Sequence, residues 1–177
     1  HQLKDSGATA IVIVENFAAT LQQVIGHTAL KHVVVTPLGE MLGALKGTLV
    51  NLAVRHVKKM VPAWSLPGSL RFNAALAAGR AHGWKRVALD RDDIAFLQYT
   101  GGTTGVSKGA MLTHANIASN VVQAHAWISP VVRDGQELIV TALPLYHIFA
   151  LTANCLTFLM IGAKNLLIVN PRDIPGF

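Results

Sequence analysis

Cysteine is almost missing from the 177-residue sequence, in which Cys155 is the only one. A single thiol excludes an internal disulfide and fits a reducing compartment. Because Cys155 lies in an apolar run, we interpret it as part of a core rather than as a nucleophile. The eight histidines are scattered and show no ligand spacing typical of zinc. A disulfide framework is therefore excluded, and a zinc site is not indicated.

Charged residues are also scarce, at 14% of the chain, whereas hydrophobic residues make up 51%. This balance excludes a disordered protein and indicates one globular domain or part of a larger one. Charge is missing altogether from 138–163, a segment long enough to suggest a transmembrane helix. Pro144, His147 and Asn154 divide this segment, however. We therefore predict a buried strand followed by a buried helix.

Acidic residues are absent from the whole stretch between Met41 and Leu89. The same stretch carries eight positive charges, more than the net charge of +6 of the whole chain. They come from Lys46, Arg55, Lys58, Lys59, Arg71, Arg80, Lys85 and Arg86. The asymmetry is explained equally well by a solvated basic face and by an anionic neighbour such as a lipid headgroup or a nucleotide-like substrate. Nucleic acid is the weakest candidate, because few aromatic residues interleave with these charges.

Short apolar runs rich in β-branched residues recur along the chain and predict strands. They occupy residues 9–15, 31–37, 92–100, 137–144 and 164–170. The runs lack clean alternation, which is typical of strands buried on both faces of a parallel sheet. Helical patterns lie between several of them. The sequence therefore predicts an α/β fold with a mostly parallel sheet and flanking helices.

Two of the predicted helices begin at a potential capping residue. Asn16 would cap a helix over 17–26, and Thr113 would cap one over 114–128. A third, over 45–61, is amphipathic and has its cations near its C-terminal end. Those cations fit the helix dipole, and they fit equally an interfacial helix lying on an anionic membrane.

The segment Tyr99–Lys108, "YTGGTTGVSK", has the composition of a phosphate-binding loop. We expect its glycines to adopt positive φ and to turn backbone amides toward an anion, while hydroxyls and a lysine add donors. The glycines are Gly101, Gly102 and Gly105, and the other donors are Thr100, Thr103, Thr104, Ser107 and Lys108. Gly109 stands where a Walker loop has Ser or Thr, so the Walker interpretation fails. Since the loop leaves a strand, we expect it at the carboxyl edge of the parallel sheet, leading into the helix capped by Thr113.

Two motifs together resemble the adenylate-forming superfamily, which includes acyl-CoA synthetases, luciferases and the adenylation domains of peptide synthetases. They are "YTGGTTGVSKGAMLTH" over 99–114 and "LPLYHIFAL" over 143–151. Ser107 departs from the proline that this family usually has before its lysine. The segments 5–12, 49–76 and 170–177 are further similar to bacterial long-chain fatty acyl-CoA synthetases. The resemblance thus covers essentially the whole chain.

The resemblance implies a two-step ligation of a long-chain fatty acid with ATP, Mg²⁺ and coenzyme A. By family analogy the residues from Tyr99 to Gly105 and from Ser107 to Gly109 would bind the nucleotide. Thr100 would lie near the metal, Thr103, Thr104 and Lys108 near the β- and γ-phosphates, and His147 near the acyl carboxylate. We assign the catalytic roles to His147 and Lys108 on this basis.

We expect residues 1–177 to be part of an AMP-binding domain that lacks its C-terminal portion and the small lid domain. The motifs with the Mg²⁺-binding Glu, the ribose-binding Asp and the adenylating Lys do not occur in the sequence. The chain alone should accordingly be inactive, and its sheet would have open edges. Two alternatives stand beside this interpretation: an adenylate-forming ligase for another carboxylate, and a non-catalytic basic module on a membrane surface. We expect a cytoplasmic protein with peripheral contact at the inner face of the cytoplasmic membrane, and no nucleic-acid partner.

Overall fold

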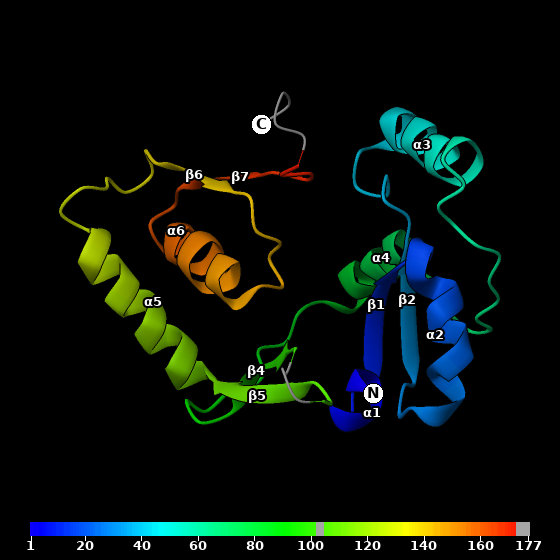
Figure 1. The fold of residues 1–177 in the computed structure, drawn as a ribbon, viewed down its shortest axis with the longest axis horizontal. Coiled ribbons are helices and arrows are strands. Elements are labelled where there is room, and N and C mark those ends of the chain that lie inside the picture. Colours follow the sequence, from blue (N-terminus) through cyan, green and yellow to red (C-terminus); the bar gives the residue numbers. More distant parts are fainter. Residues whose placement is uncertain (102–104, 173–177) are drawn as a thin grey trace. The chain divides into compact units, whose positions relative to one another are not determined.

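The computed structural model describes residues 1–101 and 105–172, and the chain divides into two compact units, His1–Val87 and Ala88–Phe177. Figure 1 shows their helices and strands in sequence colours. Each unit combines strands with flanking helices, so the predicted α/β class is confirmed.

The first unit contains a parallel sheet of three strands in the order β1-β2-β3. The strands are β1 (Ala10–Val14), β2 (His32–Thr36) and β3 (Leu70–Arg71). The register pairs Ala10 with His32 and Val34 with Leu70. The first two strands were predicted from their β-branched runs, whereas two-residue β3 gave no such signal.

Helices lie between these strands, as the crossovers of a parallel sheet require, and also before β1 and after β3. They are α1 (Gln2–Asp5), the 3₁₀ helix η1 (Glu15–Phe17), α2 (Ala18–Val24), the 3₁₀ helix η2 (Ile25–His27), α3 (Ala44–Leu52), the π-helix η3 (Ala53–Val57) and α4 (Phe72–His82). The helix predicted over 45–61 thus begins one residue earlier and ends at Val57.

The core of the first unit is small and lies between α2 and the sheet. Ala18 and Leu21 of α2 are buried with Val35 of β2 and with Leu66. Asn16 does not cap α2, contrary to the prediction. It lies inside η1, and its side-chain Nδ2 donates to the carbonyl of Met60 at 3.1 Å. The 3₁₀ turn places the start of α2 at Ala18, one residue later than predicted, and the cap residue Phe17 makes no side-chain hydrogen bond.

Helix α3 packs against the preceding loop through two glycines rather than through large side chains. A Cβ atom on Gly47 would collide with the carbonyl oxygen of Gly39, and one on Gly39 would lie 2.6 Å from the carbonyl oxygen of Gly47. Asn51 Oδ1 accepts a hydrogen bond from Gly39 N at 2.8 Å and holds the loop in place. Only residues without a side chain allow this approach.

The second unit begins with an antiparallel hairpin of β4 (Ile94–Thr100) and β5 (Lys108–Thr113). The strand β5 was not predicted, and the loop was expected to lead directly into a helix at the edge of a parallel sheet. That expectation is wrong for the described residues, because the loop is the tip of a two-stranded ribbon. Helix α5 (His114–Ile128) follows β5, with the predicted cap. Thr113 Oγ1 accepts from Asn116 N at 3.2 Å, and Asn116 Oδ1 accepts from Thr113 N at 3.0 Å.

A parallel βαβ unit completes the second unit. It consists of β6 (Leu138–Thr141), the π-helix η4 (Ala150–Leu156), α6 (Thr157–Met160) and β7 (Lys164–Leu167). A polar network joins its elements: Asn154 Nδ2 donates to Thr141 Oγ1 at 3.2 Å, and Asn165 Nδ2 donates to the carbonyl of Asn154 at 2.7 Å. The uncharged segment therefore folds as a strand followed by a helix, as predicted, but the predicted burial is wrong in part, because Leu138 and Leu159 are 55% and 67% exposed. Within the part of the chain that the structure describes, no helix is both long and apolar enough to cross a bilayer.

Burial of the strands on both faces was predicted, and this prediction is wrong. Val12 of β1 is 61% exposed, and Ile94, Leu138 and Leu167 are exposed as well. The physical reason is the small size of the sheets. With only two or three strands each, the sheets offer few neighbouring strands against which these side chains could be buried. Cys155 is half-buried in η4 rather than fully inside a core.

Candidate functional site

The ends of the glycine-rich loop are fixed by the β4–β5 ladder. Thr100 pairs with Lys108 in the register of the hairpin. Ser107 Oγ also donates to the carbonyl oxygen of Thr100 at 2.7 Å, which adds a side-chain bond across the base of the loop. Gly105 has φ +141°, a conformation that side chains disfavour. The loop is therefore a closed hairpin tip.

Tyr99 and Gly109 face each other across this hairpin. A Cβ atom at Gly109 would lie only 3.0 Å from Cζ of the Tyr99 ring. The glycine after Lys108 thus has a structural explanation, since the aromatic ring occupies the space of its missing side chain. A Walker-type Ser or Thr at this position would displace the ring.

The predicted nucleotide-binding residues are grouped around this hairpin tip. Tyr99 and Thr100 end β4, Lys108 and Gly109 begin β5, and Gly101, Gly105 and Ser107 lie between the strands. Gly102, Thr103 and Thr104 are outside the described residues. The positive φ that was expected at the glycines is present at Gly105 but not at Gly101.

The predicted catalytic histidine lies in a turn between β6 and η4. His147 N donates to the carbonyl of Pro144 at 2.9 Å, and the carbonyl of His147 accepts from Leu151 N at 2.9 Å. The imidazole is exposed, and its Nδ1 accepts from Phe149 N at 3.3 Å. In the neutral ring Nε2 therefore carries the proton and can donate to a carboxylate.

A single side chain links the two motifs. Gln98 Nε2 donates to the carbonyl oxygen of Tyr146 at 3.0 Å. Gln98 precedes the loop and Tyr146 precedes the histidine, so the bond connects β4 to the turn that carries His147. Sequence reasoning did not identify Gln98. A glutamine inside an apolar strand run was the only signal it gave.

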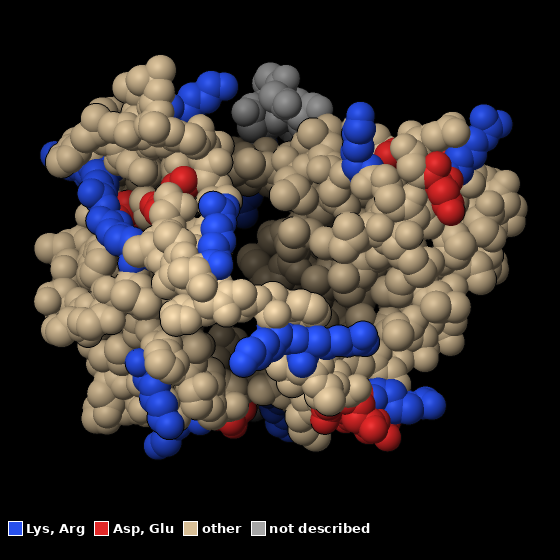
Figure 2. Space-filling view, turned by 180° about the vertical axis from the view of Figure 1, so that it is seen from behind, with Lys and Arg blue, Asp and Glu red and all other residues tan. Residues whose placement is uncertain are grey.

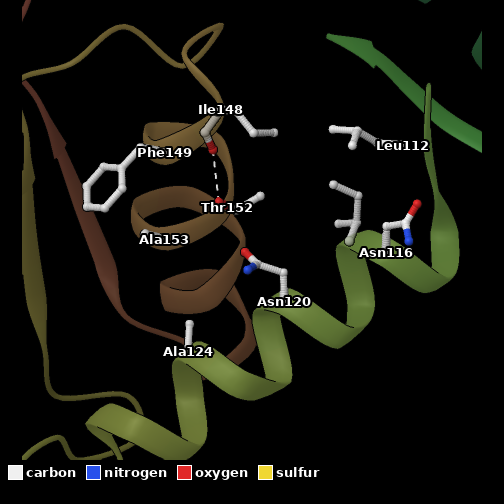
Figure 3. Close-up of a pocket in the computed structure, with 9 residues that line it drawn as sticks. Leu112, Asn116, Asn120, Ala124, Ile148, Phe149, Thr152 and Ala153 are labelled. Atoms are coloured by element: carbon white, nitrogen blue, oxygen red, sulfur yellow. Dashed lines mark hydrogen bonds between the residues drawn. The ribbon is translucent and has the colours of Figure 1, made fainter. Parts of the chain in front are cut away.

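An apolar pocket of about 560 Å³ opens between α5 and η4. Figure 3 shows the residues that line it, with Asn120 of α5 directed toward η4. They are Leu112, Asn116, Ile117, Asn120, Ala124, Ile148, Phe149, Thr152 and Ala153. Ile148 and Phe149 follow His147 in the sequence, whereas His147 itself does not line the pocket. Its volume is within the range of ligand-binding pockets.

Positive charge at the loop is not neutralised within the described part of the chain. Lys108 is exposed, and none of the ion pairs among described residues involves it. The residues of 1–101 and 105–172 also contain no group of three or more His, Cys, Asp or Glu that could hold a metal ion.

The strongest buried charge lies in the first unit, away from these motifs in the sequence. Glu15 is fully buried at the end of β1 and receives two hydrogen bonds from Arg55, one of them from Nε at 3.0 Å. Arg71 Nη1 lies 3.8 Å from the same carboxylate. The hydrogen bond to Glu15 raises the pKa of Arg55, while burial acts in the opposite direction. We interpret this triad as structural.

These features can be set beside known proteins. A family model described as AMP-binding enzyme matches residues 1–176. The chain therefore belongs to the AMP-binding enzyme family, and the resemblance seen in its sequence motifs is confirmed.

Among curated relatives, a long-chain-fatty-acid–CoA ligase of Escherichia coli O157:H7 is 56% identical over 176 residues, or 99% of this chain. The chain spans 31% of the length of that relative. Among solved structures, an anthranilate–CoA ligase in complex with anthranoyl-AMP matches with a TM-score of 0.66 at 20% identity, covering 94% of this chain and 27% of that one. A long-chain-fatty-acid–CoA ligase from Archaeoglobus fulgidus matches with a TM-score of 0.56 at 22% identity, covering 94% of this chain and 27% of that one. The two structural matches show the fold.

Proposed function

We propose that this chain supplies the polyphosphate-binding loop and the carboxylate-binding turn of a long-chain fatty acid–CoA ligase. The observation that carries the proposal is the 56% identity, over 99% of the chain, to a ligase of that substrate class. The geometry supports it, because Gln98 connects the loop-bearing strand to the turn that carries His147.

The reaction has two steps. A carboxylate oxygen of the fatty acid attacks the α-phosphorus of ATP, and the bond to pyrophosphate breaks, which leaves an acyl adenylate. The thiol of coenzyme A then attacks the acyl carbonyl carbon, loses its proton and displaces AMP. Charge on the departing pyrophosphate must be neutralised while the carboxylate is held in line.

The loop provides hydrogen-bond donors and a cation that can neutralise the charge on the departing pyrophosphate. Lys108 is an exposed cation at the start of β5, suited to a β- or γ-phosphate oxygen. Backbone amides at Gly101 and Gly105, and the backbone and side chain of Thr100, lie at the same hairpin tip. We extend the proposed phosphate contacts to Gly102, Thr103 and Thr104 on the strength of the family resemblance alone.

His147 and the apolar pocket are suited to holding the fatty acid so that its carboxylate is in line for attack. The Nε2 proton can bind the acyl carboxylate, while the adjoining pocket accepts the hydrocarbon chain. Asn116 and Asn120 place polar groups along a wall that is otherwise mostly apolar. Neither residue was singled out in the sequence. Asn116 stands three residues after the capping Thr113, which was its only signal.

Mg²⁺ is part of the proposal. Magnesium ions prefer oxygen ligands and keep several waters, so a site made of phosphate oxygens and one hydroxyl is chemically adequate. Thr100 is the residue that we propose to contribute that hydroxyl. The ion would offset the negative charge of the polyphosphate beside Lys108.

The test is thioester formation by the protein expressed from its complete gene. With ATP, Mg²⁺ and coenzyme A, we expect palmitate and oleate to be converted, and benzoate and amino acids not. Lys108→Ala should lower kcat/KM by roughly 100-fold, the scale for one preorganised charge-stabilising group. Lys85→Ala, a change of another exposed lysine, is the matched control and should leave the rate unchanged.

Conversion of an aryl or amino acid in place of the fatty acids would replace the long-chain assignment by the alternative carboxylate. If no acid is activated and Lys108→Ala has no effect on ATP binding, the ligase proposal is wrong. We also propose peripheral contact with an anionic membrane, since the proposed substrate is a membrane-derived amphiphile and the stretch 41–89 is basic.

A further inference from the structure

Helix α3 turns its large apolar side chains away from the protein. Leu45, Leu49 and Leu52 share one face by their spacing of four and three residues, and they are 77%, 60% and 50% exposed. The opposite face carries Gly47 and, about two turns further along in η3, Val54, both of which are buried. The polarity of this helix is therefore the reverse of that of an ordinary surface helix, which buries its leucines.

Packing explains the reversal. The glycine contact between Gly39 and Gly47 brings the helix backbone against the loop, so no leucine is needed at that contact. Further exposed apolar residues flank the leucines at both ends of the helix. They are Met41, Leu42, Val57 and Met60. Together with Leu45, Leu49 and Leu52 we call them the α3 apolar face.

Three lysines flank this face in the sequence, and Glu40, which precedes Met41, is half-buried and accepts a hydrogen bond from Asn73 N at 3.3 Å. Lys46, Lys58 and Lys59 are exposed, and none of the ion pairs in the described residues involves them. Arg55, by contrast, is paired with buried Glu15 and does not belong to the exposed charges. Figure 2 draws Lys and Arg side chains in blue, and they occur at several separate places on the face in view.

The backbone at Lys59 is unusual. Its φ of +49° lies in the left-handed region that glycine adopts more readily, just after the end of η3. The helix thus ends on a lysine at a position where glycine would be less strained. The substitution Lys59→Gly would therefore remove the positive charge of this side chain and relieve the backbone strain at the same time.

We propose that the α3 apolar face, with Lys46, Lys58 and Lys59, is the surface by which this protein docks on an anionic lipid bilayer. The leucines would enter the boundary between headgroups and acyl chains, and the lysines would contact the lipid phosphates. The inference rests on the peripheral membrane contact proposed above, and so on the proposed fatty-acid substrate as well as on the basic stretch 41–89. It does not depend on which residues carry out the ligation.

The charge pattern favours a bilayer over a second copy of the chain. Two copies of this face would bring their lysines together without an acidic partner, because the sequence has no acid between Met41 and Leu89. An anionic membrane matches both the apolar side chains and the lysines, since it offers phosphates in a plane above an apolar layer.

Vesicle co-sedimentation of the protein expressed from its complete gene, without ATP, tests the proposal. We expect binding to phosphatidylcholine vesicles that contain phosphatidylglycerol and much weaker binding to phosphatidylcholine alone. Leu45→Ser combined with Leu49→Ser should weaken binding at least tenfold. Lys59→Gly should weaken it about fivefold, while leaving the Tm equal or higher because the strain is relieved.

Matched controls are available elsewhere in the chain. Val131→Ser changes an equally exposed apolar residue, and Lys85→Gly removes a cation from the same basic stretch, so both should bind like the unmodified chain. If the α3 and Lys59 variants bind as well as the controls, the protein contacts the membrane but not through the α3 apolar face. If the unmodified protein binds neither kind of vesicle, both the docking surface and the proposed membrane contact are wrong. Self-association that Leu45→Ser abolishes in the absence of lipid would also overturn the bilayer assignment.

Discussion

The ring of Tyr99 occupies the space that a side chain on Gly109 would need, with Cζ 3.0 Å from the position of a Cβ atom. Gly109→Ala should therefore push the ring away and destabilise the hairpin by about 1–3 kcal/mol. Thermal unfolding followed by tyrosine and tryptophan fluorescence measures this effect. Gly101→Ala is the matched control, since its Cβ would meet nothing within 4 Å and its φ is not positive. Equal Tm values for the two variants would contradict the packing argument.

The capping box of α5 predicts a local loss of stability. Thr113→Val removes the acceptor for Asn116 N, and this should cost about 0.5–2 kcal/mol. Urea unfolding measures this loss in the free energy of unfolding. Amide hydrogen exchange should become faster only in the first turn of α5. Gln123→Ala, on the exposed side of the same helix, should change the stability by less than about 0.5 kcal/mol.

The two arginines near Glu15 should differ in their importance. Arg55→Ala leaves a fully buried carboxylate without its bidentate partner and should cost roughly 3 kcal/mol. Arg71→Ala removes a cation at 3.8 Å whose side chain is 53% exposed, so we expect about 0–1 kcal/mol. Chemical denaturation of both variants checks the ratio. A larger loss of stability from Arg71→Ala than from Arg55→Ala would contradict this, and would show that Arg71 is the main partner of Glu15.

The pH dependence of that contribution follows from the raised pKa of Arg55. A group whose pKa is higher in the folded state contributes stability below its unfolded-state pKa and loses it as the pH rises through the folded-state value. For an arginine this occurs only in strongly alkaline solution. The stability difference between the unmodified chain and Arg55→Ala should therefore be constant across the neutral range.

Gln98 is expected to act as a positioning residue for His147. Gln98→Leu removes the hydrogen bond to the carbonyl of Tyr146 and should raise the KM for the fatty acid about fivefold, the value for one hydrogen bond of about 1 kcal/mol. The KM for ATP should change much less, and this split separates positioning from general destabilisation. Steady-state kinetics of the protein expressed from its complete gene are the measurement. A parallel rise of both KM values would contradict the assignment.

Local chemistry made part of this structure predictable. Runs such as 9–15 and 31–37 are β-branched and short, and they form strands, while Thr113 was recognised as a cap from its residue type alone. The family was recognised from two motifs because glycine, threonine and lysine in that arrangement are chemically specific. These features depend on residues close together in the sequence.

Features that depend on distant contacts were missed. The strand β5 contains Gly109 and is stabilised by pairing with β4, so its own propensity gave little signal. Asn16 is a residue type that often caps helices, but its side-chain amide donates a hydrogen bond to the carbonyl of Met60, 44 residues away. The outward orientation of the α3 leucines follows from the contact between Gly39 and Gly47, which no periodicity reveals.

The pairing of Thr100 with Lys108 has a consequence for the speed of nucleotide capture. Because the backbone ladder and the Ser107 hydroxyl join the two ends of the loop, the entropy of loop closure is lost during folding rather than during binding. Association with an anion then does not have to bring Thr100 and Lys108 together. We therefore expect a loop of this design to favour rapid association, with most of the discrimination between nucleotides expressed in how quickly they leave.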